Sequence, residues 1–315
     1  MAAGNHAATT PVSLKATGVV RRRLVVQAVV KGIFGLTAAL TVGVTVLIVL
    51  SLLLPSIRFF SEVSFGEFFG SKTWAPLFNP PRFGVWPIVV GTLWTTGIAL
   101  LVSIPAGLGV AVYLSQYAHR RVRTAVKPFL EILAGIPTVV LGFFGLYFVN
   151  PRIVQTLWPG QVGTFSGLAA GLVVGALIIP TVASLAEDAM AAVPSGIREG
   201  GFALGSTRRE VATKVVFPAA MSGIVAAVVL AGSRAIGETT IVLLVAGSRP
   251  TLTWNPADQM QSMASFIGFA GIGDQPTGST GYQTIFAVGL LLFVITFVLN
   301  IASIRIVRRF REVYE

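Results

Sequence analysis

Residues 199–238 read EGGFALGSTRREVATKVVFPAAMSGIVAAVVLAGSRAIGE. The first half of this stretch is rich in glycine and charge, whereas the second half is apolar apart from Arg234 and Glu238. An apolar run of about 20 residues is long enough to cross the hydrocarbon core of a bilayer. The stretch therefore predicts a water-exposed segment that leads into a membrane span carrying two ionisable side chains.

The composition of the whole chain is typical of a membrane protein. Of its 315 residues, 54% are hydrophobic and 11% are charged, whereas soluble domains carry about 25% charged residues. The net charge is +11, but the basic residues cluster at the ends of apolar runs, which indicates membrane topology rather than nucleic-acid binding. Cysteine is absent, and His6 and His119 lie far apart, so we expect no disulfide, thiolate chemistry or histidine metal site.

Six apolar runs are predicted to form transmembrane helices, which makes the fold class an all-α membrane protein. The first run is too long for the apolar part of a signal peptide, so it is expected to be retained. The third contains Gly135-Ile136-Pro137, where proline removes a backbone hydrogen bond and permits a kink. Residues 1–28 are expected to be a disordered cytoplasmic tail. The predicted spans are residues 33–54, 87–114, 129–149, 165–185, 217–246 and 285–304.

The distribution of Lys and Arg predicts the orientation of these spans. The segments before span one, between spans two and three, between four and five, and after six hold 5, 4, 4 and 4 of them, which is 17 of 23. Basic residues favour the cytoplasmic side of a membrane. Both termini and the long loop 186–216 are therefore expected in the cytoplasm.

The segment 55–86 contains aromatic side chains among polar ones and is expected on the side of the membrane opposite the termini. Aromatic rings are enriched at the level of the lipid headgroups, so this segment is predicted to lie in the membrane interface. The alternative is a plain extracytoplasmic loop with some phenylalanines in the core. The side chains concerned are Phe59, Phe60, Phe65, Phe68, Phe69 and Trp74.

The loop 186–216 carries the signals of two short helices. Ser195 can cap the start of the first helix, and Gly205 suits its end because glycine readily adopts the left-handed conformation. Thr207 and Glu210 have the spacing of a capping box, which predicts a second helix that leads into the fifth span. A loop of this length, in which glycines let another backbone approach, is expected to dock a partner. The alternative is a helical loop whose glycines serve only its turns.

This loop resembles the EAA motif, EAA-x3-G-x9-I-x-LP, of the membrane subunits of ATP-binding-cassette (ABC) importers. Every spacing agrees, and the departure, Gly-Gly for Ala-Ala, keeps the side chains small. The resemblance implies a type I importer permease domain over residues 29–315, in which the EAA loop forms a coupling helix that docks on an ATPase subunit. The matching residues are Glu199, Gly200, Gly201, Gly205, Val215, Phe217 and Pro218.

Other strings are similar to the phosphate importer permeases, and more to the PstC type than to the PstA type. The resemblance implies a permease subunit of an ATP-driven inorganic phosphate importer in the bacterial cell membrane. Its implied partners are a PstA-like permease, two PstB-like ATPase subunits and a PstS-like phosphate-binding protein received by loops 55–86 and 247–281. The strings are GVWPIVVGTLWTT (84–96), LAGIPTVVLGFFGLYF (133–148), IIPTVASLAEDAM (178–190), SRAIGET (233–239) and the closing LLFVITFVLNIASIRIVRRFRE.

Arg234 and Glu238 are the candidate residues of the translocation pathway. A charged side chain in the middle of a membrane costs roughly 2.5–3.5 kcal/mol on insertion scales, so it is expected to face a partner or a water-filled path. The two residues are four apart, which places them on one face of a continuous helix. The guanidinium fits a tetrahedral oxyanion, and the carboxylate could hold it or accept a proton from phosphate. The alternative is an ion pair that only fixes helix packing.

Energy for transport is expected from a partner, because the chain contains no Gly-Lys pair and hence no P-loop. No catalytic residue, cofactor or nucleic-acid partner is expected on this chain. Three alternatives remain: a permease for another oxyanion such as sulfate or molybdate, an ion-coupled carrier, and an intramembrane enzyme. A carrier would show inverted repeats, and an enzyme would show a nucleophile–base pair or metal ligands within the spans. Neither pattern is visible in the sequence.

Overall fold

The computed structural model describes residues 18–309 of the chain. The chain falls into two compact units, Met1–Ser51 and Leu52–Glu315. The first helix, α1 (Gly18–Glu62), passes from one unit into the other. Of the predicted tail, the part before residue 18 lies outside the described residues, whereas residues 18–28 form the first turns of α1.

Within the first unit, α1 satisfies its polar side chains by itself. The hydroxyls of Thr41 and Thr45 each donate to a carbonyl one turn earlier, at 2.9 Å. The apolar side chains along the helix are exposed. A helix that makes its own hydrogen bonds and presents an apolar surface suits a lipid environment. The stretch Arg22–Glu62 is long and apolar enough to cross a membrane, and it contains the first predicted span.

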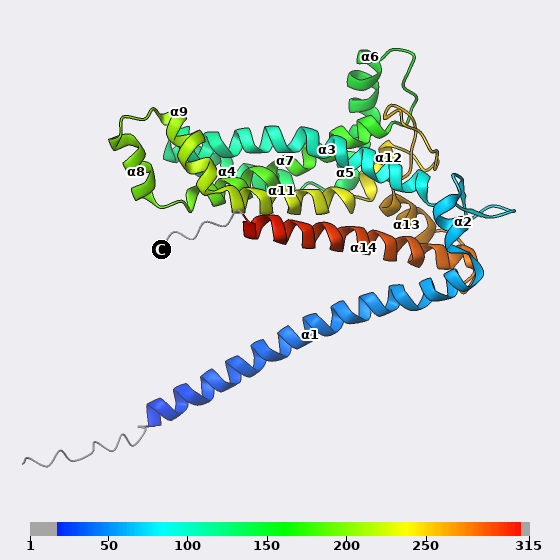
Figure 1. Ribbon diagram of the computed structural model, residues 1–315, viewed down its shortest axis with the longest axis horizontal. Helices are drawn as coiled ribbons and strands as arrows, with labels where there is room; N and C mark the ends of the chain where they lie inside the picture. Colours follow the sequence, from blue (N-terminus) through cyan, green and yellow to red (C-terminus); the bar gives the residue numbers. More distant parts are fainter. Residues whose placement is uncertain (1–17, 310–315) are drawn as a thin grey trace, which may run out of the picture. The chain divides into compact units, whose positions relative to one another are not determined.

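The second unit holds the remaining helices and one short pair of strands (Figure 1). Three stretches, labelled η, are π-helical and continue a neighbouring α-helix. In chain order the elements are α2 (Phe65–Gly70), β1 (Trp74–Ala75), β2 (Arg82–Phe83), α3 (Trp86–Val112), η1 (Tyr113–Tyr117), α4 (Arg120–Ala134), α5 (Thr138–Phe144), η2 (Gly145–Val154), α6 (Gln155–Leu157), α7 (Gly167–Ala191), α8 (Ser195–Ala203), α9 (Arg208–Glu210), η3 (Val211–Val216), α10 (Phe217–Ala219), α11 (Met221–Ile236), α12 (Thr240–Val245), α13 (Met263–Gly271) and α14 (Thr280–Arg309).

Four helices within the described part of the chain are long and apolar enough to span a membrane, and two bent pairs bring the number to six. The four are α1, α3 with η1, α7 and α14. The prediction of six spans is therefore confirmed only when each bent pair counts as one span. The bent pairs are Arg120–Ala134 with Thr138–Leu157, at 86°, and Arg208–Ala219 with Met221–Ile236, at 71°.

The first bend coincides with the Gly-Ile-Pro string that was expected to kink the third span. Proline cannot donate the backbone hydrogen bond that would continue α4, and Pro137 instead becomes the N-cap of α5. The basic segment after the second span was expected to be a loop. It forms the first turns of α4, with His119 as the N-cap, so this helix begins about nine residues before the predicted start of the third span.

The long axis of the second unit follows α3, α7, α11 and α14, with α8 and α9 at one end and α2, β1 and α13 at the other (Figure 1). Helix α7 is central, and small residues let α3 pack closely against it. A Cβ atom added to Gly171 would lie 2.7 Å from the Cβ of Ile98, and one added to Gly107 would lie 2.6 Å from that of Val182. Larger residues at these glycines would push the two helices apart.

A second core lies at the end of the unit that carries α2. Phe59, Phe68 and Trp74 are buried there against Phe266 of α13. The burial of these three rings agrees with the alternative of aromatic residues in a core, whereas Phe65 and Phe69 stay exposed. The interfacial position of the segment as a whole stays a prediction. The segment 247–281, expected to be a polar loop, supplies α13 to the same core. The two strands pair antiparallel beside it, with Trp74 opposite Phe83.

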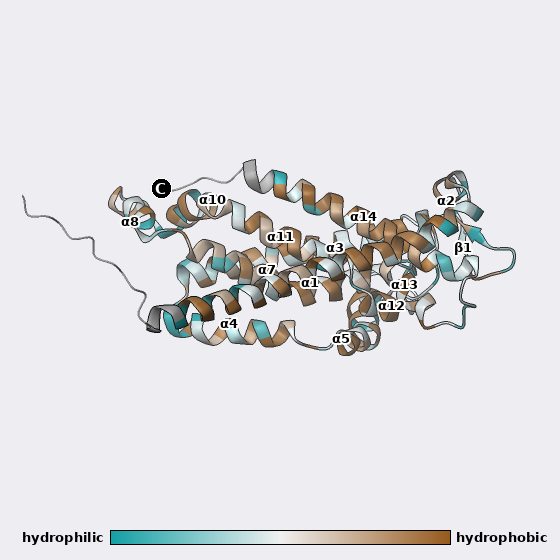
Figure 2. Ribbon diagram, turned by 90° about the horizontal axis from the view of Figure 1, so that it is seen from below, coloured by the Kyte–Doolittle hydropathy of each residue, from teal (hydrophilic) through white to brown (hydrophobic). Residues whose placement is uncertain are grey.

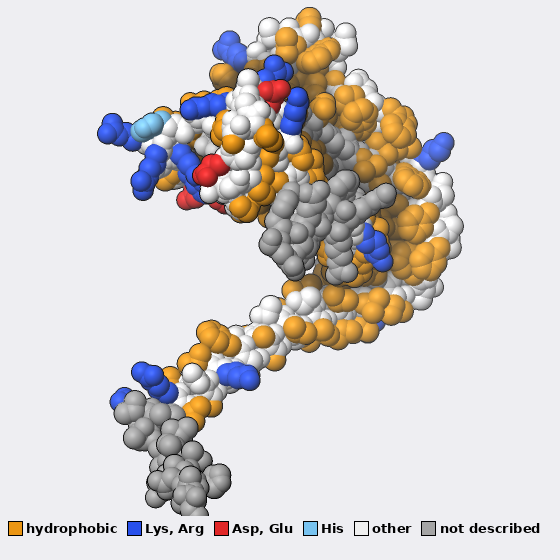
Figure 3. Space-filling view, turned by 60° about the vertical axis from the view of Figure 1, so that its left-hand side comes forward, with side chains coloured by type: hydrophobic (Ala, Val, Ile, Leu, Met, Phe, Trp, Pro, Cys, Tyr) orange, Lys and Arg blue, Asp and Glu red, His pale blue; other side chains and the backbone are white. Residues whose placement is uncertain are grey.

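The surface of the second unit separates charge from apolar area. The lengths of α11 and α14 are mostly hydrophobic, and hydrophilic residues are more frequent towards α8 and β1 (Figure 2). Lys and Arg side chains gather around the end that carries α8, α9 and the start of α4 (Figure 3). This separation is what a bilayer requires, because charged side chains stay in water while apolar side chains face lipid.

Candidate functional site

The segment that matches the EAA motif begins with α8. Its N-cap is Pro194 and no side chain caps it, so the prediction of Ser195 as N-cap is off by one residue. The helix is tied to the end of α7 by Arg198, whose Nη2 donates to the carbonyls of Met190 at 2.6 Å and Ala191 at 3.3 Å. The guanidinium thereby satisfies carbonyls that lack partners at a helix end. The position of α8 thus depends on α7.

The end of α8 confirms the structural prediction for Gly205. Its φ angle is +80°, a conformation that costs little only for glycine. The Gly205 amide donates to the carbonyl of Phe202 at 3.0 Å, and the Ser206 amide donates to that of Gly201 at 3.2 Å. This is the hydrogen-bond pattern of a Schellman motif. It ends α8 sharply and turns the chain towards α9.

The capping box predicted at the start of the next helix is also present. The Glu210 amide donates to Thr207 Oγ1 at 3.3 Å, and the Thr207 amide donates to Glu210 Oε2 at 3.1 Å. These hydrogen bonds, together with nearby Lys214, lower the pKa of the Glu210 carboxyl below its ordinary value. The helix then runs without interruption as Arg208–Ala219 and bends into α11.

The outer surface of α8 is exposed and partly apolar. Glu199 and Gly200 are exposed, and Leu204 is 89% exposed. A Cβ on Gly200 would meet no atom within 4 Å, whereas a Cβ on Gly201 would lie 3.1 Å from a methyl of Val211. The two glycines therefore differ: Gly201 lets α8 pack on η3, whereas Gly200 is exposed and has no neighbour at its Cβ position.

Glu238 does not lie on the helix that the sequence predicted for it. Helix α11 ends at Ile236 with Gly237 as its C-cap, so Glu238 does not share a helix with Arg234. Its Oε1 accepts hydrogen bonds from the amides of Thr240 at 3.1 Å and Ile241 at 3.2 Å. A carboxylate at this point satisfies free amides and complements the helix dipole. The prediction of one shared helix face is therefore wrong, because the helix stops between the two residues.

Arg234 instead contacts two other helices. Its Nη1 donates to Thr181 Oγ1 on α7 at 3.0 Å, and its Nη2 donates to the carbonyl of Ala134 at 3.4 Å. Ala134 is the last residue of α4, where carbonyls lack helical partners and a cation is favourable. Within residues 22–305, no carboxylate forms a salt bridge with Arg234. The positive charge of the guanidinium therefore has no paired anion. The side chain is exposed on the described unit.

The sequence reasoning missed three contacts that are made by side chains of α7. Glu187 on α7 is buried and pairs with Arg123 and Lys127 of α4. Thr181 holds Arg234. One signal was available for Thr181: the string Ile-Pro-Thr-Val occurs at residues 136–139 and again at 179–182, and Arg234 contacts the chain near both copies.

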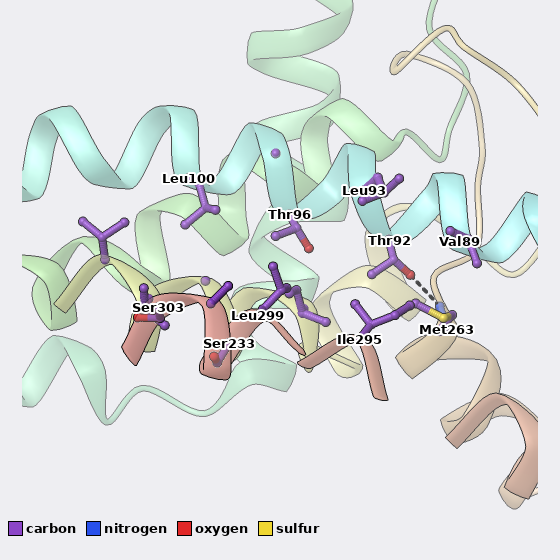
Figure 4. A pocket seen from close by; sticks show the side chains of 16 residues that line it. Val89, Thr92, Leu93, Thr96, Leu100, Ser233, Met263, Ile295, Leu299 and Ser303 are labelled. Atoms are coloured by element: carbon purple, nitrogen blue, oxygen red, sulfur yellow. Dashed lines mark hydrogen bonds between the residues drawn. The ribbon is translucent and has the colours of Figure 1, made fainter. Parts of the chain in front are cut away.

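A pocket of about 460 Å³ lies on another side of α11. It is lined by apolar side chains of α3, α11 and α14, and the Thr92 hydroxyl within it accepts a hydrogen bond from the Met263 amide (Figure 4). Arg234 is not among its lining residues. The lining carries no basic side chain and only the hydroxyls of Thr92, Thr96, Ser233 and Ser303. It therefore lacks the positive charge expected of an anion site. The searched residues also contain no cluster of three or more His, Asp or Glu that could hold a metal ion.

Solved structures with this fold are membrane transporters. The methionine ABC transporter MetNI in an inward-facing conformation matches with a TM-score of 0.54 and 22% identity, over 73% of this chain and 95% of that chain. A bacterial alginate ABC transporter, in complex with an alginate-bound periplasmic protein, matches with a TM-score of 0.59 and 16% identity, over 94% of this chain and 98% of that chain. These similarities establish the type I importer permease fold.

Proteins related in sequence are likewise named as transport permeases. The probable ABC transporter permease protein YqgH of Bacillus subtilis is 36% identical over 232 residues, 73% of this chain and 74% of that protein. The phosphate transport system permease protein PstC of Haemophilus influenzae is 31% identical over 296 residues, 88% of this chain and 93% of that protein. A family model described as "Binding-protein-dependent transport system inner membrane component" matches residues 103–312. The protein therefore belongs to the family of inner membrane components of binding-protein-dependent transport systems, and is a multi-pass membrane protein.

Proposed function

We propose that the protein is the PstC-like permease subunit of an ATP-driven importer of inorganic phosphate. The similarity to proteins named as PstC, which extends over most of the chain, is the observation that supports this function best. The uncompensated guanidinium of Arg234 supplies the matching chemistry, since Arg binds tetrahedral oxyanions through two parallel N–H donors.

Arg234 is the proposed pathway contact for the anion. Its observed partners are a hydroxyl and a carbonyl, both neutral, so the positive charge remains available. Charge-assisted hydrogen bonds to an oxyanion are roughly twice as strong as neutral ones. The site is open rather than enclosed, which favours transient binding and release over tight retention. Glu238, which directly precedes the N-cap Thr239, acts in this proposal by accepting hydrogen bonds from the first two amides of α12 rather than as the partner of Arg234.

The segment 199–218 is the proposed link to the energy source. The family works with a binding protein, and relatives named as ABC transporter permeases imply a separate ATPase. Residues Glu199, Gly200 and Gly201 lie on or next to the exposed surface of α8, Gly205 ends that helix, and Pro218 lies one turn before α11. Motion of a docked ATPase at α8 would therefore reach α11, and with it Arg234, through the turn at Gly205 and the helix Arg208–Ala219, which bends into α11 at Ala220.

The proposed assembly contains four kinds of subunit in the bacterial cell membrane. A PstA-like permease pairs with this chain, two PstB-like ATPase subunits dock on α8 from the cytoplasm, and a PstS-like binding protein delivers phosphate. Both termini lie in the cytoplasm in this proposal, because the basic residues gather at the end of the unit that carries α8 (Figure 3). The binding protein would meet the opposite end, where α2 and α13 lie.

Uptake of labelled anions tests the function directly. A strain that lacks this chain, and the same strain with the chain restored, are compared for uptake of labelled phosphate, sulfate and molybdate. Restored phosphate uptake that needs the ATPase partner is the expected result. Restored sulfate or molybdate uptake without phosphate uptake would assign another oxyanion. Phosphate uptake that persists without any ATPase partner would make the protein an ion-coupled carrier.

A further inference from the structure

Arg234 is held between the end of α4 and the interior of α7 by one close and one long hydrogen bond. We propose that Thr181 is a positioning residue for Arg234 and the second contact of the transported oxyanion at this point of the pathway. This role rests on the proposed function, since it concerns the same anion. It assigns to α7 a direct part in transport, whereas the sequence pointed only to the fifth span.

Among the described residues, the hydroxyl hydrogen of Thr181 has no acceptor. A threonine hydroxyl can donate one hydrogen bond while it accepts others. Thr181 Oγ1 accepts from Arg234 Nη1 at 3.0 Å, and among the described residues it donates to no acceptor. Other threonines in the same bundle donate to their own helix: Thr92 to the carbonyl of Ile88 at 2.7 Å, and Thr95 to that of Gly91 at 2.9 Å. The unused hydrogen of Thr181 is therefore free for an anion bound beside the guanidinium.

The two hydrogen bonds that the Arg234 guanidinium donates differ in length and therefore in strength. The bond from Nη1 to Thr181, at 3.0 Å, has ordinary length, whereas the bond from Nη2 to the Ala134 carbonyl, at 3.4 Å, lies beyond the usual range of about 2.7–3.2 Å. An oxyanion is a stronger acceptor than a neutral carbonyl. The anion is therefore expected to replace the Ala134 carbonyl at Nη2, while Thr181 keeps Nη1 in place and donates its own hydrogen to a second anion oxygen.

The repeated string Ile-Pro-Thr-Val offers a matched control. Thr138 occupies in the first copy the position that Thr181 occupies in the second, and both side chains are partly buried. Among the described residues, no hydrogen bond joins Thr138 to Arg234. The same substitution at the two threonines thus removes the same hydroxyl from the same tetrapeptide, but only one change affects the guanidinium.

The test uses the full importer, with its partner subunits, in cells that lack the native copy of this chain. Phosphate uptake is measured at saturating phosphate for Thr181→Val, Thr181→Ala, Thr181→Ser and Thr138→Val. Loss of a hydrogen bond that involves a charged group is expected to slow uptake about 10-fold in Thr181→Val and Thr181→Ala. Thr181→Ser, which keeps the hydroxyl, should stay within about 2-fold of the wild type. Thr138→Val should match the wild type.

A double-mutant comparison separates positioning from packing. In an Arg234→Lys background the forked donor geometry is gone, so Thr181→Val should add less than about 2-fold to the loss. Wild-type uptake in both Thr181→Val and Thr181→Ala would overturn the role of Thr181. So would failure of Thr181→Ser to restore uptake, or full additivity with Arg234→Lys. A wild-type importer that takes up no phosphate would instead refute the proposed function itself.

Discussion

The ammonium group of Lys127 lies 3.0 Å from the Glu187 carboxylate, which is only 1% exposed on α7. Arg123, one turn earlier on α4, pairs with the same carboxylate, and Lys127 also reaches the exposed Asp188. A buried carboxylate is tolerated when it is paired, and its removal leaves cations without a partner. This cluster therefore fixes the first half of α4 against α7, ahead of the Pro137 break.

Glu187→Ala is expected to destabilise the packing of α4 on α7. Removal of one partner from a fully buried pair costs about 3–5 kcal/mol, and partial exposure of Arg123 and Lys127 reduces this to about 1–3 kcal/mol. Thermal unfolding of the purified importer in detergent measures the effect. Asp188→Asn is the control, since Asp188 is 55% exposed and should change stability by at most about 1 kcal/mol. Equal effects of both changes would contradict the structural role of Glu187.

Arg234→Ala is expected to abolish phosphate uptake while the importer still assembles. The hydrogen bonds of Arg234 to α4 and α7 come from its guanidinium and go to neutral groups, so its removal leaves no buried charge without a partner. Uptake of labelled phosphate and co-purification of the partner subunits are measured together. Arg305→Ala, at an exposed position near the end of α14, is the control. Full uptake by an assembled Arg234→Ala importer would exclude the pathway role.

Gly205→Val is expected to uncouple ATP hydrolysis from transport. A β-branched side chain at φ +80° costs roughly 1–2 kcal/mol or more, which displaces the end of α8. The phosphate transported per ATP hydrolysed in proteoliposomes should fall several-fold. The control is Gly205→Asn. Asparagine tolerates the left-handed conformation, so this variant should stay close to the wild type. Unchanged coupling in Gly205→Val would argue against docking at this segment.

Glu238→Gln separates the two roles considered for this carboxylate. If it caps α12, glutamine keeps the acceptor oxygen, and uptake should fall at most a few-fold with an unaltered dependence on pH. Glu238→Ala should lose the cap and about 0.5–2 kcal/mol of local stability. Phosphate uptake is measured for both variants between about pH 6 and pH 8. This range covers about two pH units around the phosphate pKa. Loss of the pH dependence in Glu238→Gln would show that the carboxylate takes a proton from the anion.

The capping box predicts how the start of α9 responds to acid. The folded state lowers the pKa of Glu210 through its hydrogen bonds with Thr207, so this contribution to stability is present above the ordinary pKa of 4.5. It is lost as the pH falls below 4.5 and passes through the lowered pKa of the folded state. The Thr207 amide donates to the Glu210 carboxylate, so its hydrogen exchange, corrected for the intrinsic pH dependence, should show weaker protection in this range. Thr207→Val should weaken protection of the Glu210 amide, which donates to Thr207 Oγ1, already at neutral pH.

Local sequence was enough to predict the elements whose cause is local. Gly205 in the left-handed conformation and the reciprocal bonds of Thr207 and Glu210 depend on residues within one or two turns, and both are present. Six long apolar runs were likewise visible, because each must cover the thickness of a bilayer. The break at Pro137 followed from proline chemistry, but its 86° angle did not, since it depends on what packs on either side.

Tertiary structure decided which side chains meet. Phe59, Phe68 and Trp74 look like interfacial residues in the sequence, yet packing against Phe266 buries them in a core. Arg234 and Glu238 are separated because α11 ends between them. The strongest local signal for this helix end was a single glycine, Gly237. The contact from Arg234 to Thr181 spans 53 positions of the chain. Sequence alone thus determined a helical membrane protein with a capped helical segment before its fifth span. The packing of α4 and α7 around α11 decided the surroundings of Arg234, because side-chain hydrogen bonds depend on distances between helices rather than on spacing along one.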